Sequence, residues 1–285
     1  MTPPTTLPDT PARDLGAGEP GARFLDLAAA EWIKLRSLRS TWTAYGATAL
    51  AVIAFNAGTA YDTYSYWPAR SAAERDEFVR NGIPLQEAFT ANAAVVMMLA
   101  LVAVGAVTIL GEYGTGTIRT TFAAVPARRS VMAAKAAVLA AVTTAFGAVV
   151  AGASFALTQA ILGARDAGVP ISHPGALALV LASALLAPVC ALTGMAIGSV
   201  IRRTAATMTV SVVVVLVLPL VFSDDRHWSA VAGHATLYQA WLRLAEAGLP
   251  PTAYPWTAAG AWTVYAVWAG AATALAVTGV HRRDQ

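Results

Sequence analysis

The stretch AFTANAAVVMMLALVAVGAVTILG, Ala88–Gly111, runs for 24 residues without an Asp, Glu, Lys or Arg. A helix of about 20 apolar residues crosses the hydrocarbon core of a bilayer. The stretch is too long for an ordinary buried strand and lacks the alternation expected of a strand in a membrane barrel. It therefore predicts a membrane-spanning helix.

Other parts of the chain repeat this pattern. Five more uncharged stretches are long enough to span: Ser40–Tyr61, Ala136–Ala164, Ala167–Ile201, Thr204–Ser223 and Ala247–His281. Prolines shorten the fourth and the last of the six, because proline cannot continue a helix. Helices are then expected to begin near Gly175 and Trp256. The expected spans are 41–60, 90–111, 136–160, 175–199, 204–222 and 257–280.

The composition supports the same class of protein. Of the 285 residues, 57% are hydrophobic and 12% are charged, whereas soluble domains carry about 25% charged residues. Residues 1–22 are rich in Pro, Thr and Gly and predict a disordered tail rather than a signal peptide. The remainder, 23–285, is predicted to be one all-α, polytopic membrane domain with six transmembrane helices.

The basic residues predict the orientation of these helices. With both termini on the cytoplasmic side, 13 of the 19 Lys and Arg residues fall in inside segments and six in outside segments. Lys and Arg near helix ends are retained in the cytoplasm. We therefore expect a multi-pass plasma-membrane protein with both termini cytoplasmic.

Catalytic and cofactor motifs are missing. There is no phosphate-binding GxxxxGK[ST] loop, and the four histidines lie apart, without metal-ligand spacing. The single cysteine, Cys190, has no partner for an intrachain disulfide. The expected spans contain no charged relay residues, and Asn56, Asn92 and Gln159 are expected to bond between helices. We expect no catalytic, cofactor or metal residues on this chain, so any energy for transport must come from a partner.

Two segments outside the spans have a helical pattern. In Phe24–Arg39, aromatic and aliphatic residues share one face, with Trp32 among them, and Glu31 interrupts this face. Lys34, Arg36 and Arg39 supply positive charge. This favours a helix in the cytoplasmic interface, although a plain basic flank explains the charges without a helix. The segment Val231–Ala245 favours either an amphipathic helix at the outer leaflet or a loop packed on the external helix ends. Small residues, including Gly194 and Gly198 in GxxxG spacing, are expected at helix contacts.

The most polar connector, GEYGTGTIRTTFAAVPARRSVMAAK, spans Gly111–Lys135. Its glycines permit a change of direction, and Thr115 or Thr117 can cap a new helix. The segment TIRTTFAAV then makes about two turns before Pro126 ends it. This pattern suits a short helix that docks to a cytosolic partner, and an ordinary basic loop is the alternative.

These residues resemble the first cytoplasmic loop of ABC-2 type permeases, transmembrane subunits of ABC transporters. The run EWIKLRSLRSTW, Glu31–Trp42, is similar to the start of many actinobacterial members. With the six-span layout, the resemblance covers about residues 24–283. The elements that carry it in the loop are Glu112, Gly116-Thr117-Ile118, Pro126, Arg128-Arg129 and Lys135.

The resemblance implies a function and a site. Thr117–Val125 is expected to be a coupling helix seated in a separate cytosolic ABC ATPase, with Glu112 tying the second span to it and Arg119 facing the ATPase. The interfacial helix corresponds to the family's connecting helix. The expected ATPase-coupling residues are Glu112, Thr117, Ile118, Arg119, Phe122 and Pro126.

The working transporter implied by the resemblance contains two permease chains, like or unlike, and two ATPases. ATP and Mg are bound by the ATPase, and the permease itself is not an enzyme. It exports an amphiphilic substrate such as a drug, antibiotic or lipid across a bacterial plasma membrane, in contact with membrane lipids and without nucleic acid. Two rival functions stay open: an ATP-independent carrier or channel, and a non-transporting membrane scaffold.

Overall fold

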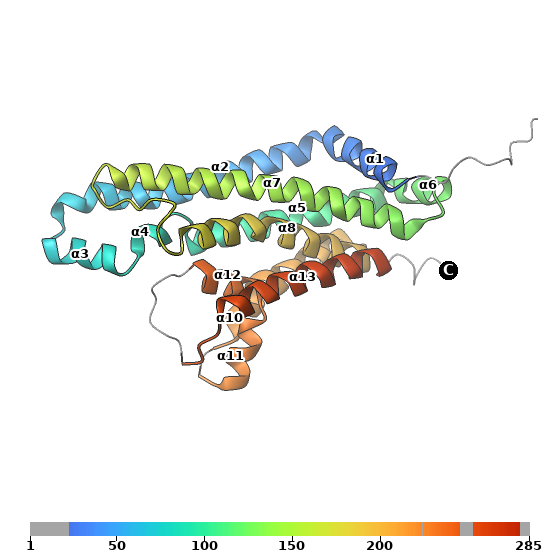
Figure 1. The fold of residues 1–285 in the computed structure, drawn as a ribbon. Coiled ribbons are helices and arrows are strands. Elements are labelled where there is room, and N and C mark those ends of the chain that lie inside the picture. The colour runs from blue at the N-terminus through green and yellow to red at the C-terminus, as the bar shows by residue number, and fades with distance from the viewer. Residues whose placement is uncertain (1–22, 224, 246–252, 280–285) are drawn as a thin grey trace, which may run out of the picture.

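A computed structural model describes residues 23–223, 225–245 and 253–279. In these residues every regular element is a helix and no strand occurs, which confirms the all-α prediction. Long helices run side by side along one axis, with some short helices at its ends and others projecting from one side (Figure 1). The tail expected over 1–22 lies outside the described residues.

Four long helices form most of the bundle: α2 (Arg39–Tyr66), α5 (Ala91–Thr115), α7 (Arg128–Gly163) and α8 (Ala176–Ile201). α8 is central, because it packs against α5, α7 and α13 (Ala258–Gly279). It is largely buried along its length, including Cys190. Its first residue follows Gly175, as expected, and this glycine has a positive φ of 89°.

Glycines let these helices approach closely. A Cβ on Gly105 of α5 would lie 1.8 Å from the Ala191 carbonyl oxygen, and one on Gly194 of α8 would lie 1.9 Å from the Val102 carbonyl oxygen. A Cβ on Gly198 would lie 2.7 Å from Ile109 Cγ2. The structure thus confirms that Gly194 and Gly198 lie at a helix contact, where close backbone approach supplies van der Waals packing.

The segment before α13 is less regular. α9 (Thr204–Val212) continues through the π-helical η2 (Val213–Val217) into α10 (Leu218–Val221). Pro219 lies in the first turn of α10, and a proline removes a backbone donor, which accounts for irregular hydrogen bonding just before it.

Two separate helices, α11 (His227–His234) and α12 (Leu237–Ala245), cover the segment Val231–Ala245. The sequence had left open one amphipathic helix or a packed loop there. α12 packs against α8 and α13. Trp241 is buried in α12, and its Nε1 donates to Ser183 Oγ of α8 at 3.0 Å. The first alternative, one continuous helix, was therefore wrong, because a turn at Ala235 and Thr236 separates α11 from α12.

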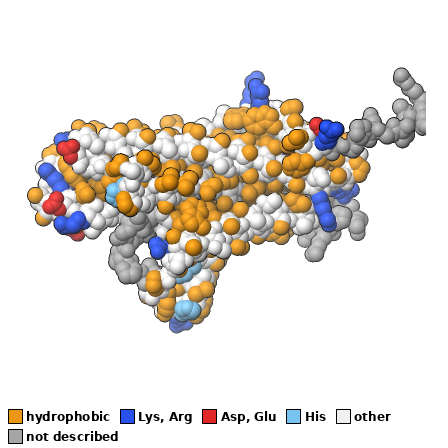
Figure 2. Space-filling model, viewed as in Figure 1, with side chains coloured by type: hydrophobic (Ala, Val, Ile, Leu, Met, Phe, Trp, Pro, Cys, Tyr) orange, Lys and Arg blue, Asp and Glu red, His pale blue; other side chains and the backbone are white. Residues whose placement is uncertain are grey.

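Short elements close the end of the bundle far from α1 (Phe24–Ser37), here called the α3 end (Figure 1). They are η1 (Trp67–Ala69), α3 (Ala72–Arg80) and α4 (Ile83–Gln86). Charged side chains gather over the α3 end, whereas hydrophobic side chains cover much of the face between the two ends (Figure 2). A largely hydrophobic surface between the ends is the pattern of a protein that crosses a bilayer.

Polar side chains join the helices near the α3 end. Asn56 of α2 donates to Ser154 Oγ of α7 at 3.2 Å and accepts from the amide and hydroxyl of Thr90, both at 3.0 Å. Gln159 donates to the Pro84 carbonyl at 2.8 Å. Both residues therefore bond between elements as predicted, while Asn92 is exposed.

Within the described residues, five helical segments are long and apolar enough to cross a membrane: Ile83–Thr115, Arg128–Gly163, Ala176–Ile201, Thr204–Val221 and Ala258–Gly279. α2 is not among these five, although its 28 residues exceed the length needed to span. The chain is therefore a multi-pass membrane protein, and the sixth span remains a prediction.

Candidate functional site

The N-terminal helix α1 packs against the start of α7. Leu27 of α1 forms a small buried cluster with Val131 and Ala134 of α7. The buried residues of α1 are Leu27, Glu31 and Leu35, spaced four apart, and they define the face that meets the bundle. Trp32 is 40% exposed whereas Leu35 is buried, so only part of the apolar face expected from the sequence meets the bundle.

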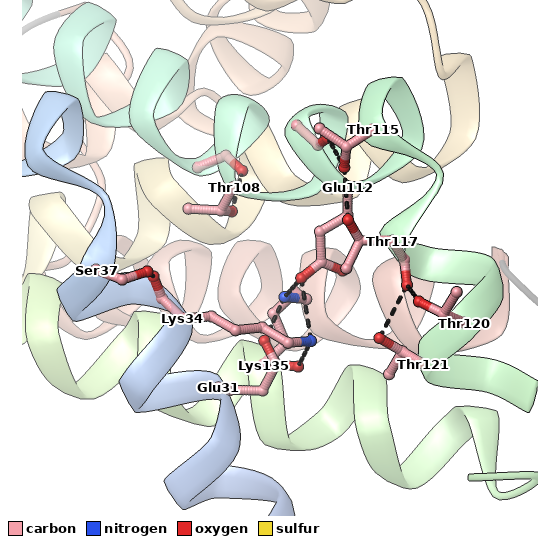
Figure 3. Close-up of polar contacts among 12 residues, drawn as sticks. Glu31, Lys34, Ser37, Thr108, Glu112, Thr115, Thr117, Thr120, Thr121 and Lys135 are labelled. Atoms are coloured by element: carbon pink, nitrogen blue, oxygen red, sulfur yellow. Dashed lines mark hydrogen bonds and ion pairs between the residues drawn. The ribbon is translucent and has the colours of Figure 1, made fainter. Parts of the chain in front are cut away.

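Four charged side chains meet beneath this face and form a closed ring, here called the charge ring: Glu31, Lys34, Glu112 and Lys135 (Figure 3). Lys34 Nζ lies 2.7 Å from Glu31 Oε1 and 3.3 Å from Glu112 Oε1. Lys135 Nζ lies 2.7 Å from Glu112 Oε1 and also pairs with Glu31 Oε2. Each lysine therefore bridges the same two carboxylates, and the ring joins α1, α5 and α7.

The charge ring is largely shielded from water. Glu31 and Lys135 are buried, whereas Lys34 is one-third exposed at the edge. Burial disfavours the charged form of Lys34, but the carboxylates of Glu31 and Glu112 outweigh it and raise the pKa of this lysine above its usual value. Two positive and two negative charges cancel, which offsets the cost of removing them from water.

The short helix α6 (Thr117–Ala124) begins directly beyond the ring. Gly116 joins α5 to α6 with φ 74°, a conformation that glycine adopts readily. No side chain caps the start of α6, so the expected cap by Thr115 or Thr117 was wrong. Their hydroxyl oxygens instead lie 2.7 Å apart, and the Thr115 hydroxyl donates to the Gly111 carbonyl at 2.9 Å. α6 ends at Ala124, two residues before the exposed Pro126.

The apolar side of α6 faces this chain's own bundle. Ile118 is buried in the main core, and Phe122 is half-buried between that core and the small cluster of α1 and α7. The Arg128 guanidinium lies 5.4 Å from the Phe122 ring centroid. Arg119 and Thr120 are exposed. Ile118 and Phe122 therefore anchor α6 to the bundle, and the polar side is left accessible.

A basic cavity of ≈ 480 Å³ lies beside α6. Arginines from three places in the sequence line it: Arg119 from α6, Arg128 from the start of α7 and Arg202 from the end of α8. The Arg202 guanidinium lies 4.8 Å from the Tyr113 ring centroid. This surface of the bundle is therefore positively charged and suits an acidic group.

The remaining expected site residues are dispersed. Arg36 and Arg39 are exposed, and they form no ion pair within 4.0 Å in the part of the chain described by the structure. Glu112 was expected to tie α5 to the coupling helix, but its hydrogen bonds go to α1 and α7. The sequence analysis did not identify Glu31 as a site residue, although it interrupts the apolar face of its helix. It also assigned no partner to Lys135. That interruption was the available signal, since a lone acid among apolar residues needs an opposite charge when buried.

Comparison with known proteins agrees with this architecture. The sequence matches the ABC-2 family transporter protein over residues 27–221, more than half of the chain. The chain therefore belongs to the ABC-2 family and is a membrane permease of an ABC-type transporter. No curated protein matches it.

Proposed function

We propose that this chain is the membrane-spanning subunit of an ATP-driven exporter and that α6 is the coupling helix that docks into a separate cytosolic ABC ATPase. The observation that carries the proposal is the placement of α6. Its apolar residues Ile118 and Phe122 are held by the bundle, while Arg119 projects outward. A helix that is anchored to the bundle on one side and exposed on the other can transmit a displacement from a partner to the bundle.

The charge ring supports a mechanical role for this end of the molecule. Glu112 and Lys135 lie on α5 and α7, the two long helices that α6 connects. On α1, Glu31 pairs with Lys135 and Lys34 pairs with Glu112, so α1 is tied to both. A displacement of α6 would then move α1, α5 and α7 together, and it would not be absorbed by bending of the connecting loop. Packed elements move as units because interiors are close-packed.

The transporter contains two permease chains and two ATPases, with ATP and Mg bound by the ATPases. Both permease termini lie in the cytoplasm, so that α1 and α6 are on the ATPase side and α3 on the outside. The substrate is an amphiphile, such as a drug, antibiotic or lipid. Trp32, Arg36 and Arg39 of the α1 region contact the inner leaflet, where anionic lipids attract basic side chains.

Affinity purification of the tagged chain from its native membranes in mild detergent tests the proposal. An ABC ATPase that co-purifies, before or after crosslinking, is the expected result. Repeated recovery of the chain without any ATPase would contradict the coupling function and favour an ATP-independent carrier or a scaffold.

A further inference from the structure

A second acidic residue is buried at the opposite end of the bundle. Glu87 lies between α4 and α5 and is 7% exposed. Its Oε1 accepts a hydrogen bond from the Thr63 hydroxyl at 2.7 Å. Its Oε2 is also buried, and it has no hydrogen-bond partner in the residues that the structure describes. One of the two carboxylate oxygens is therefore buried without a hydrogen-bond donor from the described residues.

Such an arrangement is costly for a fold. A buried carboxylate loses its hydration, and the loss is offset when a positive charge and hydrogen bonds replace the water. The ion pairs found in the described residues all belong to the charge ring, so Glu87 has none within 4.0 Å. Arg70, the basic residue in the neighbouring cavity, has its guanidinium over Phe78, 4.8 Å from the ring centroid. The Arg70 charge still acts on Glu87 from this position, but it supplies no hydrogen bond to Oε2, and a ligand can supply that donor.

A cavity of ≈ 370 Å³ lies beside Glu87, between α2, the α4–α5 junction and α12. Phe89 and Trp241, both buried, border the cavity, and their ring centroids lie 6.1 Å apart. The Trp241 Nε1–H is already donated to Ser183, so the two rings offer aromatic surface and no free indole donor. Asn92 also lines the cavity and is exposed, which places an opening at the surface.

The donor set favours an organic cation over a metal ion. No group of three or more His, Cys, Asp or Glu side chains among the described residues could hold a metal. One carboxylate beside aromatic rings instead matches an ammonium group, because the carboxylate accepts its N–H donors and the ring faces attract its charge. The second cavity that Glu87 touches, ≈ 330 Å³, already contains the Arg70 cation and suits such a ligand less well.

We propose that the cavity between Glu87, Phe89 and Trp241 binds an amphiphilic organic cation, with the ligand's ammonium group on Glu87 and its apolar body against the two rings. The inference rests on the proposed function, since such a ligand is a substrate of the exporter. It narrows the amphiphiles that the exporter moves to those carrying a positive charge.

A matched pair of probes tests the site. Dansylcadaverine carries a primary ammonium on an apolar fluorophore, and its N-acetyl derivative has the same body without the charge. Binding of each to the full chain is measured in phosphatidylcholine nanodiscs by energy transfer from tryptophan to the dansyl group, with empty nanodiscs as the blank. Zwitterionic lipid avoids attraction of the amine to anionic headgroups. Glu87→Gln keeps the shape of the side chain, and Glu77→Gln, an exposed residue of the second cavity, is the control.

Wild type and Glu77→Gln are expected to bind the amine at least tenfold more tightly than the acetylated probe, and Glu87→Gln is expected to lose this difference. Equal affinity of the wild-type chain for both probes would by itself overturn the proposal, whatever the variants show. Unchanged amine binding by Glu87→Gln would overturn it as well. Neither measurement contains an ATPase, so failure here leaves the coupling proposal standing, and failure of ATPase co-purification leaves this site standing.

Discussion

Glu112 and Lys135 pair at 2.7 Å across the two ends of the segment that contains α6. The two residues are 23 positions apart in the sequence, on α5 and α7, and the pair closes the loop at its base. Because Glu31 and Lys34 complete the ring, the base of α6 is fixed to three helices at once. This geometry makes the charge ring the structural foundation of the proposed coupling helix.

Removing one member of the ring should destabilise the bundle. Lys135→Met leaves two carboxylates without a buried partner, and breaking a buried pair from one side costs roughly 3–5 kcal/mol. We expect a clear drop in the thermal midpoint, measured by size-exclusion chromatography of heated detergent samples. Arg129→Met, an exposed site on the same helix, should change little. A Lys135→Met midpoint equal to that of wild type would contradict the ring.

Exchanging the two charges should not restore stability. In an isolated pair, Glu112→Lys with Lys135→Glu would rebuild the attraction. In the ring, the new lysine faces Lys34 and the new glutamate faces Glu31, so two repulsions replace two attractions. The double variant should therefore be at least as unstable as Lys135→Met in the same chromatographic assay. Recovery to the wild-type midpoint would indicate an independent pair.

The glycine contact between α5 and α8 should tolerate no side chain. Gly105→Ala places a Cβ against backbone atoms of Ala191, which cannot move aside as a side-chain end can. Overpacking of this kind costs about 1–3 kcal/mol or more. Gly111→Ala, on the same helix with no atom within 4 Å of the added Cβ, is the matched control. Equal thermal midpoints for the two variants would show that the helices are not in contact here.

The polar junction at Asn56 should contribute to helix association. Asn56→Leu removes three hydrogen bonds and leaves the Ser154 and Thr90 groups to find other partners, at about 1–3 kcal/mol. We expect lower thermal stability with normal membrane insertion. Asn92→Leu changes the same residue type at an exposed position and should be close to neutral. A comparable loss in both variants would argue against a specific role for the Asn56 network.

The orientation of the bundle can be read by cysteine labelling. A cysteine at Ala73 in α3 should react with a membrane-impermeant maleimide on intact cells, and one at Ala127 should react only after lysis. Both positions are exposed, and the native Cys190 is buried. The neighbouring Ser71 is left unchanged, because its hydroxyl accepts a hydrogen bond from the Glu74 amide and caps α3. The reverse labelling pattern would place both termini outside.

The sequence predicted the elements better than their contacts. Long uncharged runs marked helices such as α5 and α8, because a membrane helix is specified by local composition. Local sequence also indicated the limits of α6, with Gly114 and Gly116 before it and Pro126 after it. Gly194 and Gly198 were predicted at a helix contact because small residues at this spacing let two membrane helices approach closely.

The charge ring and the Glu87 cavity depended on packing between distant parts of the chain. Glu31 was interpreted only as an interruption of an apolar face. One of its partners, Lys34, is three residues away, but the buried partner Lys135 is 104 residues away along the chain. Ile118 and Phe122 were read as a surface for a partner, whereas they pack on their own bundle. An amphipathic pattern indicates that one face of a helix is buried, but it does not indicate which surface covers that face.

Arg119→Glu tests the central claim most directly. Arg119 is exposed on α6, so reversing its charge should leave folding and insertion intact while repelling an acidic surface on the ATPase. Co-purified ATPase is quantified per permease for wild type, Arg119→Glu and the control Arg129→Glu, an exposed arginine beyond α6. The account predicts a loss of at least tenfold for Arg119→Glu and recovery near wild type for Arg129→Glu. Wild-type recovery of the ATPase with Arg119→Glu would contradict docking through α6.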